Sequence, residues 1–221
     1  QSNNIACNHS ASVDSTNNQA KNSLSDLSEN VKIFITDYQT HGRGRGQNDW
    51  LTPGSNNSFL MSWVFKLPAA PQAITAPLIG LSLYRAASLT WPNIQWSIKP
   101  PNDLKLSNKK VAGLLIEAIQ QGNSNFLIIG IGFNILSHPE SLSEATHLNS
   151  PDGLKGQLKE SELYLFLNQL NNEIQSALPL ITHTHLTQES CQLLAQATGA
   201  QKVTPVGDLV FNDSVISWKE L

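Results

Sequence analysis

The chain has 221 residues, of which 40% are hydrophobic and 14% charged, and its formal net charge at pH 7 is −3. This length gives one sizeable core, or a large domain with a small appendage. The acidic balance argues against nucleic-acid binding over the whole surface, so any anion site must be local. The two cysteines lie near opposite ends and form no metal spacing or disulfide framework, which predicts a reduced, cytoplasmic protein.

The elements follow from apolar periodicity and from turn residues, taken in chain order. Helices are expected at 14–27, where Thr16 and Gln19 have capping-box spacing, and at 72–89, 161–178 and 188–197. Strands are expected at 31–38, 59–67, 94–98, 104–106, 111–119 and 126–135, with two more short ones within 203–218. Short turns join the strands between 94 and 135, so the class is α+β, with a mixed, largely antiparallel central sheet flanked by helices.

The connection between the first two expected strands contains two of the three arginines of the chain, Arg43 and Arg45, within the glycine-rich run 41–47. Glycine lets a backbone approach a ligand closely, and guanidinium groups bind phosphate or carboxylate bidentately. The length of the connection and its Pro53-Gly54 pair predict a mobile, functional loop. A solvated loop or a fragment of an RNA-binding tail is the competing interpretation.

Neither common nucleotide-binding signature is present. The chain contains no G-x-x-x-x-G-K-[ST] sequence, and Gly130-Ile131-Gly132 lacks the third glycine of a dinucleotide fingerprint. A purely parallel nucleotide-binding fold is therefore disfavoured.

Five short motifs occur in one order along the chain. They are Asp14-Ser15-Thr16-Asn17, Gln39 with Gly42-Arg43-Gly44-Arg45 and Trp50, Lys99-Pro100-Pro101-Asn102-Asp103-Leu104, Lys110-Val111-Ala112-Gly113-Leu114-Leu115-Ile116-Glu117, and Gly130-Ile131-Gly132-Phe133-Asn134. In this order and spacing the set resembles the catalytic domain of biotin–protein ligases over roughly residues 13–180. The resemblance implies a class II synthetase-like fold of the biotin/lipoate ligase type.

The activity implied by this resemblance is that of a biotin–[acetyl-CoA-carboxylase] ligase, an ATP-dependent enzyme. It would use ATP and Mg²⁺ to form biotinyl-5′-AMP, and would then transfer biotin to one lysine of a biotin carboxyl carrier protein. A carboxylate that attacks a triphosphate meets like-charge repulsion, so cations are needed in the site. The resemblance assigns this role to Arg43, Arg45 and Lys110, although Lys110 alone would be interpreted as a surface lysine.

The resemblance also assigns binding residues on several segments. Those for biotin are Ser15, Thr16, Asn17, Gln39, Arg43, Gly44, Arg45, Trp50, Lys110, Gly113 and Leu115. Those for ATP and the adenylate are Arg43, Arg45, Asn102, Lys110 and Asn134. No resident metal ligands are expected. Helix capping by the serine and threonine, and core packing by the tryptophan and the glycines, are the structural alternatives.

Asp103 is a further candidate catalytic residue, since it follows the abrupt Pro100-Pro101 turn. Its carboxylate is expected either to hold Mg²⁺ or to receive the proton of the incoming lysine, which is mostly protonated near neutral pH. The chain departs from the family at Pro100, where a tryptophan is common, and at 46–49, where more positive charge is usual. Both departures predict a looser hold on the adenylate.

Three segments are expected: a flexible N-terminal segment at 1–12, the catalytic domain at 13–198, and a short tail at 199–221. No winged-helix domain precedes residue 13, so no DNA partner is expected. The family's small C-terminal β-barrel needs about 45–55 residues, so the tail is interpreted as a possible remnant. A homodimer through a sheet edge is expected from the resemblance alone.

Three other functions compete with the ligase. A lipoate or octanoate ligase or transferase would share the lysine and the acyl-transfer chemistry, but lacks the Gly-Arg-Gly-Arg repeat at this position. A non-catalytic biotin-binding protein would fit the short tail and Pro100. An RNA-binding protein would use the Gly/Arg loop, which the acidic charge opposes.

Overall fold

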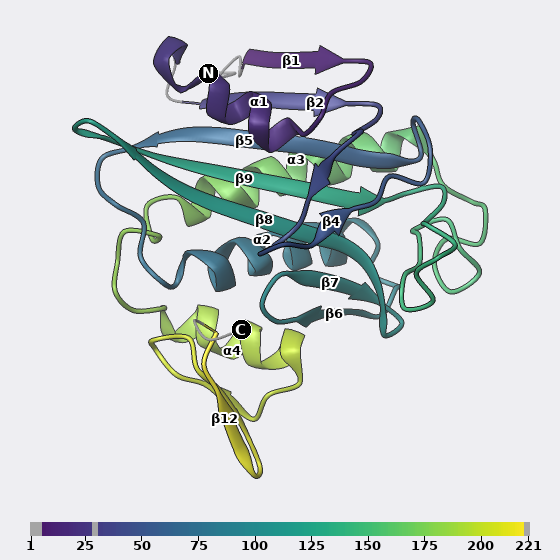
Figure 1. The fold of residues 1–221 in the computed structure, drawn as a ribbon. Helices are drawn as coiled ribbons and strands as arrows, with labels where there is room; N and C mark the ends of the chain where they lie inside the picture. The colour runs from purple at the N-terminus through teal and green to yellow at the C-terminus, as the bar shows by residue number, and fades with distance from the viewer. Residues whose placement is uncertain (1–5, 28–30, 219–221) are drawn as a thin grey trace. The chain divides into compact units, whose positions relative to one another are not determined.

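The structure is a computed structural model that describes residues 6–27 and 31–218 (Figure 1). It divides into two compact units. The first unit contains the chain up to residue 70 and residues 111–148, and the second contains 71–110 and 149–221.

The first unit is built on a mixed sheet. Its strands, in spatial order, are β1 (Ala6–Ser10), β2 (Val31–Thr36), β5 (Ser58–Leu67), β9 (Ser124–Asn134) and β8 (Lys109–Gln121). β1 pairs with β2 in parallel, and the other pairs are antiparallel. The long apolar runs of β5 and β9 are mostly buried, because these strands are central and have neighbours on both sides.

A short helix, α1 (Thr16–Asn22), covers one face of this sheet and is followed by the 3₁₀ turn η1 (Leu24–Asp26). The helix packs on β2, β5 and β9. The apolar cluster beneath it consists of Ala20, Leu24, Phe34, Val64, Phe126 and Ile128. The helix is shorter than expected, because the Ser23 N–H bonds back to Ala20 O and closes the last turn.

The capping box predicted at Thr16 and Gln19 is wrong. Ser15 is the N-cap, and its side chain makes no capping hydrogen bond. The Thr16 backbone N–H and hydroxyl are both directed to Gln39 Oε1, at 2.8 and 3.1 Å. The start of this helix is therefore held by the following loop instead of by a local cap.

The long Gly/Arg connection contains a small antiparallel ladder. β3 (Gly42–Arg43) pairs with β4 (Asp49–Trp50), and the Gly44 N–H donates to Asn48 O at 2.8 Å. Gly46, at the tip, has φ +66°, a backbone conformation that favours glycine. These contacts define where the loop's side chains point.

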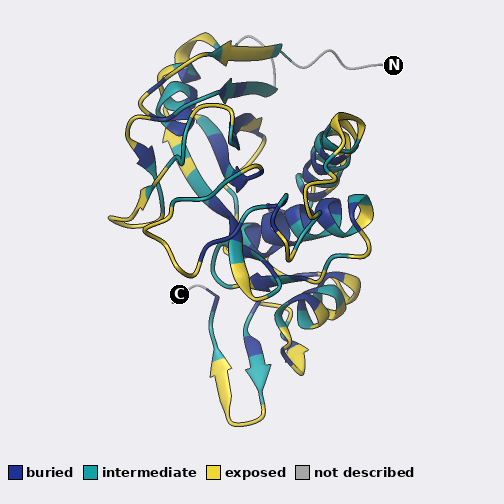
Figure 2. Ribbon diagram, turned by 90° about the vertical axis from the view of Figure 1, so that its right-hand side faces the viewer, coloured by how far each residue is buried: buried dark blue, intermediate teal, exposed yellow. Residues whose placement is uncertain are grey.

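The second unit is mainly helical. α2 (Thr75–Thr90) packs against α3 (Glu160–Ala177), α4 (Gln188–Thr198) and the hairpin of β6 (Trp96–Lys99) and β7 (Asp103–Leu106). Most residues of α2 are buried, as its dark blue colour in Figure 2 shows. A helix with neighbours on several sides needs apolar residues around most of its circumference.

The C-terminal part of this unit forms a three-stranded antiparallel sheet, where two short strands were expected. Its strands are β10 (Lys202–Val203), β11 (Leu209–Phe211) and β12 (Ser214–Ile216). Figure 2 shows that the β11–β12 hairpin is largely exposed toward its tip. Beyond it, Trp218 is only 4% exposed, and its indole N–H donates to Pro101 O at 3.0 Å.

The expected fold class is confirmed, since strands of a largely antiparallel sheet are flanked by helices in each unit. Within the segment 1–12 that was expected to be flexible, residues 6–10 form β1, and residues 1–5 lie outside the described residues. β1 is an edge strand with exposed side chains, so no apolar alternation marks it in the sequence. Among the described helices, none is long and apolar enough to cross a membrane.

Candidate functional site

Glycines lie in two adjacent rows across the sheet of the first unit. Ser62 on β5, Gly130 on β9 and Leu115 on β8 are in register. Two residues further along β9, Gly132 pairs with Gly113 of β8. Because side chains alternate along a strand, the two glycines of β9 share one face and leave space above it.

Side chains from other elements fill part of that space. A Cβ on Gly130 would lie 2.9 Å from Asn17 Cγ, and closer still to Asn17 Oδ1. A Cβ on Gly132 would lie 2.6 and 2.7 Å from two ring carbons of Trp50. Both glycines are therefore required by close approach, one for an amide of α1 and the other for the indole of the Gly/Arg loop.

A chain of short buried polar groups runs from the loop to the sheet. Gln39 Oε1 accepts from the Thr16 backbone N–H at 2.8 Å, the hydroxyls of Thr16 and Ser62 lie 2.7 Å apart, and Ser62 Oγ donates to Asn17 Oδ1 at 2.6 Å. Ser62 has one hydroxyl proton, so it can donate to Thr16 Oγ1 or to Asn17 Oδ1 but not to both at once, whereas the Thr16 hydroxyl can accept from Ser62 and donate to Gln39. All four residues are buried, and the most exposed of them, Gln39, is 8% exposed. The result is a rigid frame of donors and acceptors.

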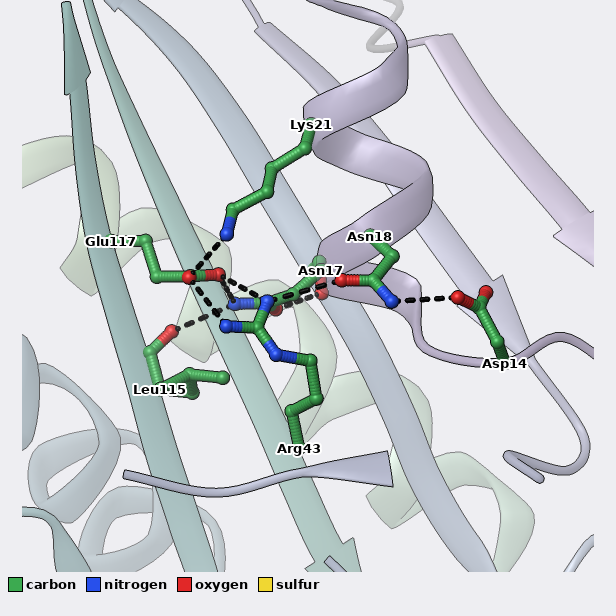
Figure 3. A network of polar contacts seen from close by, with 8 residues as sticks. Asp14, Asn17, Asn18, Lys21, Arg43, Leu115 and Glu117 are labelled. Atoms are coloured by element: carbon green, nitrogen blue, oxygen red, sulfur yellow. Dashed lines mark hydrogen bonds and ion pairs between the residues drawn. The ribbon is translucent and has the colours of Figure 1, made fainter. Parts of the chain in front are cut away.

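Glu117 of β8 lies at the centre of a second network (Figure 3). Its carboxylate pairs with Lys21 Nζ at 2.6 Å and with Arg43 Nη2 at 3.0 Å, and accepts from Asn17 Nδ2 at 2.8 Å. Burial alone would raise the pKa of Glu117. The hydrogen bonds from Lys21, Asn17 and Arg43 outweigh burial, so its pKa is lowered.

The two arginines of the loop have different surroundings. Arg43 Nη1 also donates to Asn18 Oδ1 at 3.1 Å, and Asn18 in turn donates to Asp14 at 2.6 Å. Chiefly through that hydrogen bond from Asn18, the pKa of Asp14 is lowered. Arg45 is exposed, and no carboxylate in the described part of the chain pairs with it. Arg45 is thus the arginine of the loop that is open to an anionic ligand.

Two charged candidates lie in the second unit. Lys110 Nζ and Asp103 Oδ1 form an ion pair at 2.7 Å, with the two side chains 36% and 15% exposed. Asp103 is the first residue of β7, and Asn102 precedes it in the turn after β6. The pair brings an acid and a base together beside that turn.

Asn134, at the end of β9, holds the segment that follows the strand. Its amide donates to Thr146 O at 3.1 Å, and its backbone carbonyl accepts from the Leu148 N–H at 3.0 Å. His138 and His147 stack nearby, with their Nδ1 atoms 2.9 Å apart. Burial first, and His138 second, lower the pKa of His147. The expected adenylate contact of Asn134 stays a prediction.

The first unit therefore brings together most of the expected biotin residues. Thr16, Asn17, Gln39, Arg43 and the carbonyl of Leu115 share the two networks. Trp50 lies on Gly132, Ser15 is buried at the helix start, and Gly44 closes the loop ladder. The expected residues Asn102, Asp103 and Lys110 belong to the second unit.

Two residues of the site were missed in the sequence. Ser62 is a hydroxyl within the apolar run 59–65 of β5, which was a usable signal. Glu117 ends one of the five motifs, and it is the acidic residue in the 13-residue strand β8. A carboxylate inside a strand that leads into a core needs a partner, but the sequence does not say which one.

Comparison with known proteins gives the family. The model of the biotin/lipoate A/B protein ligase family matches residues 10–134. The biotin–[acetyl-CoA-carboxylase] ligase of Paracoccus denitrificans is 30% identical over 149 residues, which cover 66% of this chain and 62% of the relative. The bifunctional ligase/repressor BirA of Escherichia coli is 32% identical over 133 residues, which cover 56% of this chain and 38% of that protein.

Solved structures show a similar fold. The solved biotin protein ligase from Aquifex aeolicus in complex with biotin and ATP superposes with a TM-score of 0.68 at 22% identity, covering 95% of this chain and 94% of that one. The chain spans less than two thirds of the length of the curated relatives that it matches first. Since the family model covers more than half of the residues, the chain belongs to the biotin/lipoate A/B protein ligase family.

Proposed function

We propose that this protein is an ATP-dependent biotin–protein ligase. In the first step the biotin carboxylate attacks the α-phosphate of MgATP, and biotinyl-5′-AMP forms as pyrophosphate leaves. In the second step a lysine amine of an acceptor protein attacks the acyl carbon, and AMP leaves. The observation that carries the proposal is the buried polar frame above Gly130, and relatives named as biotin ligases support it.

The polar frame suits the ureido ring of biotin. That ring is neutral and flat, with two N–H donors and one carbonyl acceptor, so it needs short polar groups in fixed positions. The hydroxyls of Thr16 and Ser62 and the amides of Asn17 and Gln39 are such groups, and the network fixes their orientation. Burial strengthens each hydrogen bond to a ligand because water does not compete.

The cations suit the adenylation step. Arg45 is open on the loop, and Lys110 is held by Asp103 in the second unit. Positive charges neutralise the repulsion between the biotin carboxylate and the phosphates, and they stabilise the leaving pyrophosphate. No group of three metal-ligating side chains exists within residues 6–27 and 31–218, so Mg²⁺ would enter as MgATP, with oxygens mainly from the phosphates.

Asp103 is proposed to receive the proton of the acceptor lysine in the transfer step. Its pairing with Lys110 holds the carboxylate in place, at 15% exposure. Asp103→Asn keeps the shape and removes the base, so we expect slower transfer from preformed biotinyl-5′-AMP. Transfer at the normal rate in this variant would show that another group takes the proton.

The acceptor is proposed to be a biotin carboxyl carrier protein, as the name of the Paracoccus relative suggests, and the reaction is proposed to occur in the cytoplasm. The purified chain should label such a carrier domain with biotin in an ATP-dependent manner, detected with streptavidin. A carrier whose target lysine is replaced by arginine is the control. A protein that labels a lipoyl domain with lipoate or octanoate instead belongs to the other branch of the family, and one that binds biotin without labelling either domain is a binding protein.

A further inference from the structure

Glu117 places a carboxylate beside the loop of a site that we propose for anionic substrates. Its neighbours Lys21 and Arg43 leave one net positive charge over the three groups. The Glu117 side chain is only 16% exposed, so these ion pairs are less screened than pairs on an open surface. The negative charge of Glu117 is therefore more than neutralised by Lys21 and Arg43, so it repels an anionic substrate only weakly.

Arg43 is paired with this carboxylate through two hydrogen bonds. Its Nη2 donates to Oε1 at 3.0 Å and its Nη1 to Oε2 at 3.3 Å, a two-point contact that fixes the plane of the guanidinium. Nη1 also donates to Asn18 Oδ1 at 3.1 Å. Since Arg43 lies on β3, this contact anchors the whole β3–β4 ladder at one point.

Asn17 is oriented by the same carboxylate. Its Nδ2 donates to Glu117 Oε2 at 2.8 Å and to the Leu115 carbonyl at 3.3 Å, as Figure 3 shows. Both amide protons are thereby used, so Asn17 Oδ1 must point the other way, toward Ser62 and Gly130. The acceptor that faces the polar frame is set by Glu117.

From these contacts we infer that Glu117 is a positioning residue that joins the Gly/Arg loop to the Asn17 end of the ligand site. One carboxylate fixes Arg43, and with it the loop 42–50, and also fixes the direction of the Asn17 amide. Loop closure and recognition of the ureido ring are then coupled. The ligand part of this inference rests on the proposed function, whereas the attachment of the loop does not.

A simpler role for Glu117 is to anchor α1 through Lys21. The two roles predict different effects, because Lys21→Met removes only the anchor, whereas Arg43→Gln removes only the loop contact. The second unit offers a matched control in Glu173, which is 17% exposed and pairs with Arg85 at 2.7 Å. Glu173→Gln deletes an arginine–carboxylate pair of similar burial outside the first unit.

The first experiment needs no ligand. A protease needs an extended segment around the bond that it cuts, so trypsin cleavage after Arg45 speeds up when the loop 42–50 opens, and its initial rate reports on loop attachment. We expect Glu117→Gln and Arg43→Gln each to be cut roughly tenfold faster than the unchanged protein, and Lys21→Met and Glu173→Gln to stay within about twofold. Equal cleavage rates in all five proteins would overturn the inference. Arg43→Gln alters a loop residue, so it keeps the test decisive if Glu117→Gln does not fold.

The second experiment measures biotin binding by titration calorimetry. Glu117→Gln and Arg43→Gln should each weaken binding roughly tenfold, and the double variant should be no weaker than the worse single one. Additive losses would show that the two residues act separately, and would overturn the coupling. Faster cleavage of the variants with no biotin binding by the unchanged protein would refute the proposed function and keep the loop attachment.

Discussion

Gly132→Ala tests whether Trp50 fixes the Gly/Arg loop on the sheet. The added Cβ would lie 2.6 and 2.7 Å from two carbons of the indole, and closer still to a third. A ring cannot bend away as a flexible chain does, and Gly132 pairs with neighbours on both sides. The indole must therefore leave the face of β9, and the β3–β4 ladder loses its second attachment.

The magnitude follows from the area that the ring loses. A tryptophan side chain buries roughly 200 Å². Trp50 is half-buried, and the ring face that lies on β9 accounts for about half of that area, or roughly 100 Å². At about 25 cal/mol per Å², the closed loop is weakened by about 2.5 kcal/mol, or roughly 70-fold in the ratio of closed to open loop. The global free energy of unfolding should change much less, because alanine suits a strand better than glycine.

The assay is again the rate of trypsin cleavage after Arg45, with biotin affinity measured beside it. In a Trp50→Ala background, Gly132→Ala should cause almost no further change in cleavage rate or in biotin affinity, since the clash no longer exists. Gly122→Ala controls for backbone strain without a clash, because a Cβ there meets no atom within 4 Å but the φ of +58° disfavours alanine. Wild-type cleavage and wild-type biotin affinity in Gly132→Ala would refute the placement of the indole.

Three further outcomes are expected. Gly130→Ala should displace the Asn17 amide and weaken biotin binding at least tenfold by calorimetry, since the new Cβ would lie 2.9 Å from Asn17 Cγ; unchanged affinity would contradict the role of that amide. Trp218→Phe should lower the free energy of unfolding by about 1 kcal/mol in urea, because the bond to Pro101 is lost, without changing biotin affinity; a changed affinity would contradict a purely structural role. Folded His147 has a lowered pKa, so the unfolded chain binds more protons as pH falls below 6.5, and stability in urea should decline there. His147→Gln should reduce that decline, and an identical pH profile would refute the assignment.

Much of the fold could be predicted because strong local patterns mark the central elements. The run 59–67 is apolar almost throughout, and it forms the buried strand β5 within one residue of its expected start. The helix expected at 161–178 has a regular apolar stripe, and it is found at Glu160–Ala177. In both segments the same residues that form the core also produce the pattern.

The remaining elements depend on contacts that no local pattern reveals. β1 is held by hydrogen bonds to β2, which its polar sequence does not reveal. The sequence therefore predicted a frayed end. Thr16 looked like a helix cap, yet it is bound by a glutamine 23 residues away. Competition between a local cap and a distant partner is decided by tertiary structure.

The site shows the same division. The motif residues could be named because their types and order resemble a family, and the structure brings several of them into one network. Ser62 and Glu117 could not be chosen in this way, because their roles come from strand register and from a three-way contact around one carboxylate. The sequence thus predicted the kind of chemistry, whereas strand register determines which side chains position the groups of the site.

The most direct test of the proposed function is ATP–pyrophosphate exchange by the purified chain, with biotin, lipoate and octanoate supplied in turn. Exchange requires that an acid attack the α-phosphate reversibly, so it reports the adenylation step without any acceptor protein. We predict exchange with biotin and none with the other two acids. Exchange with lipoate or octanoate alone, or no exchange with any acid while biotin still binds, would contradict the assignment as a biotin ligase.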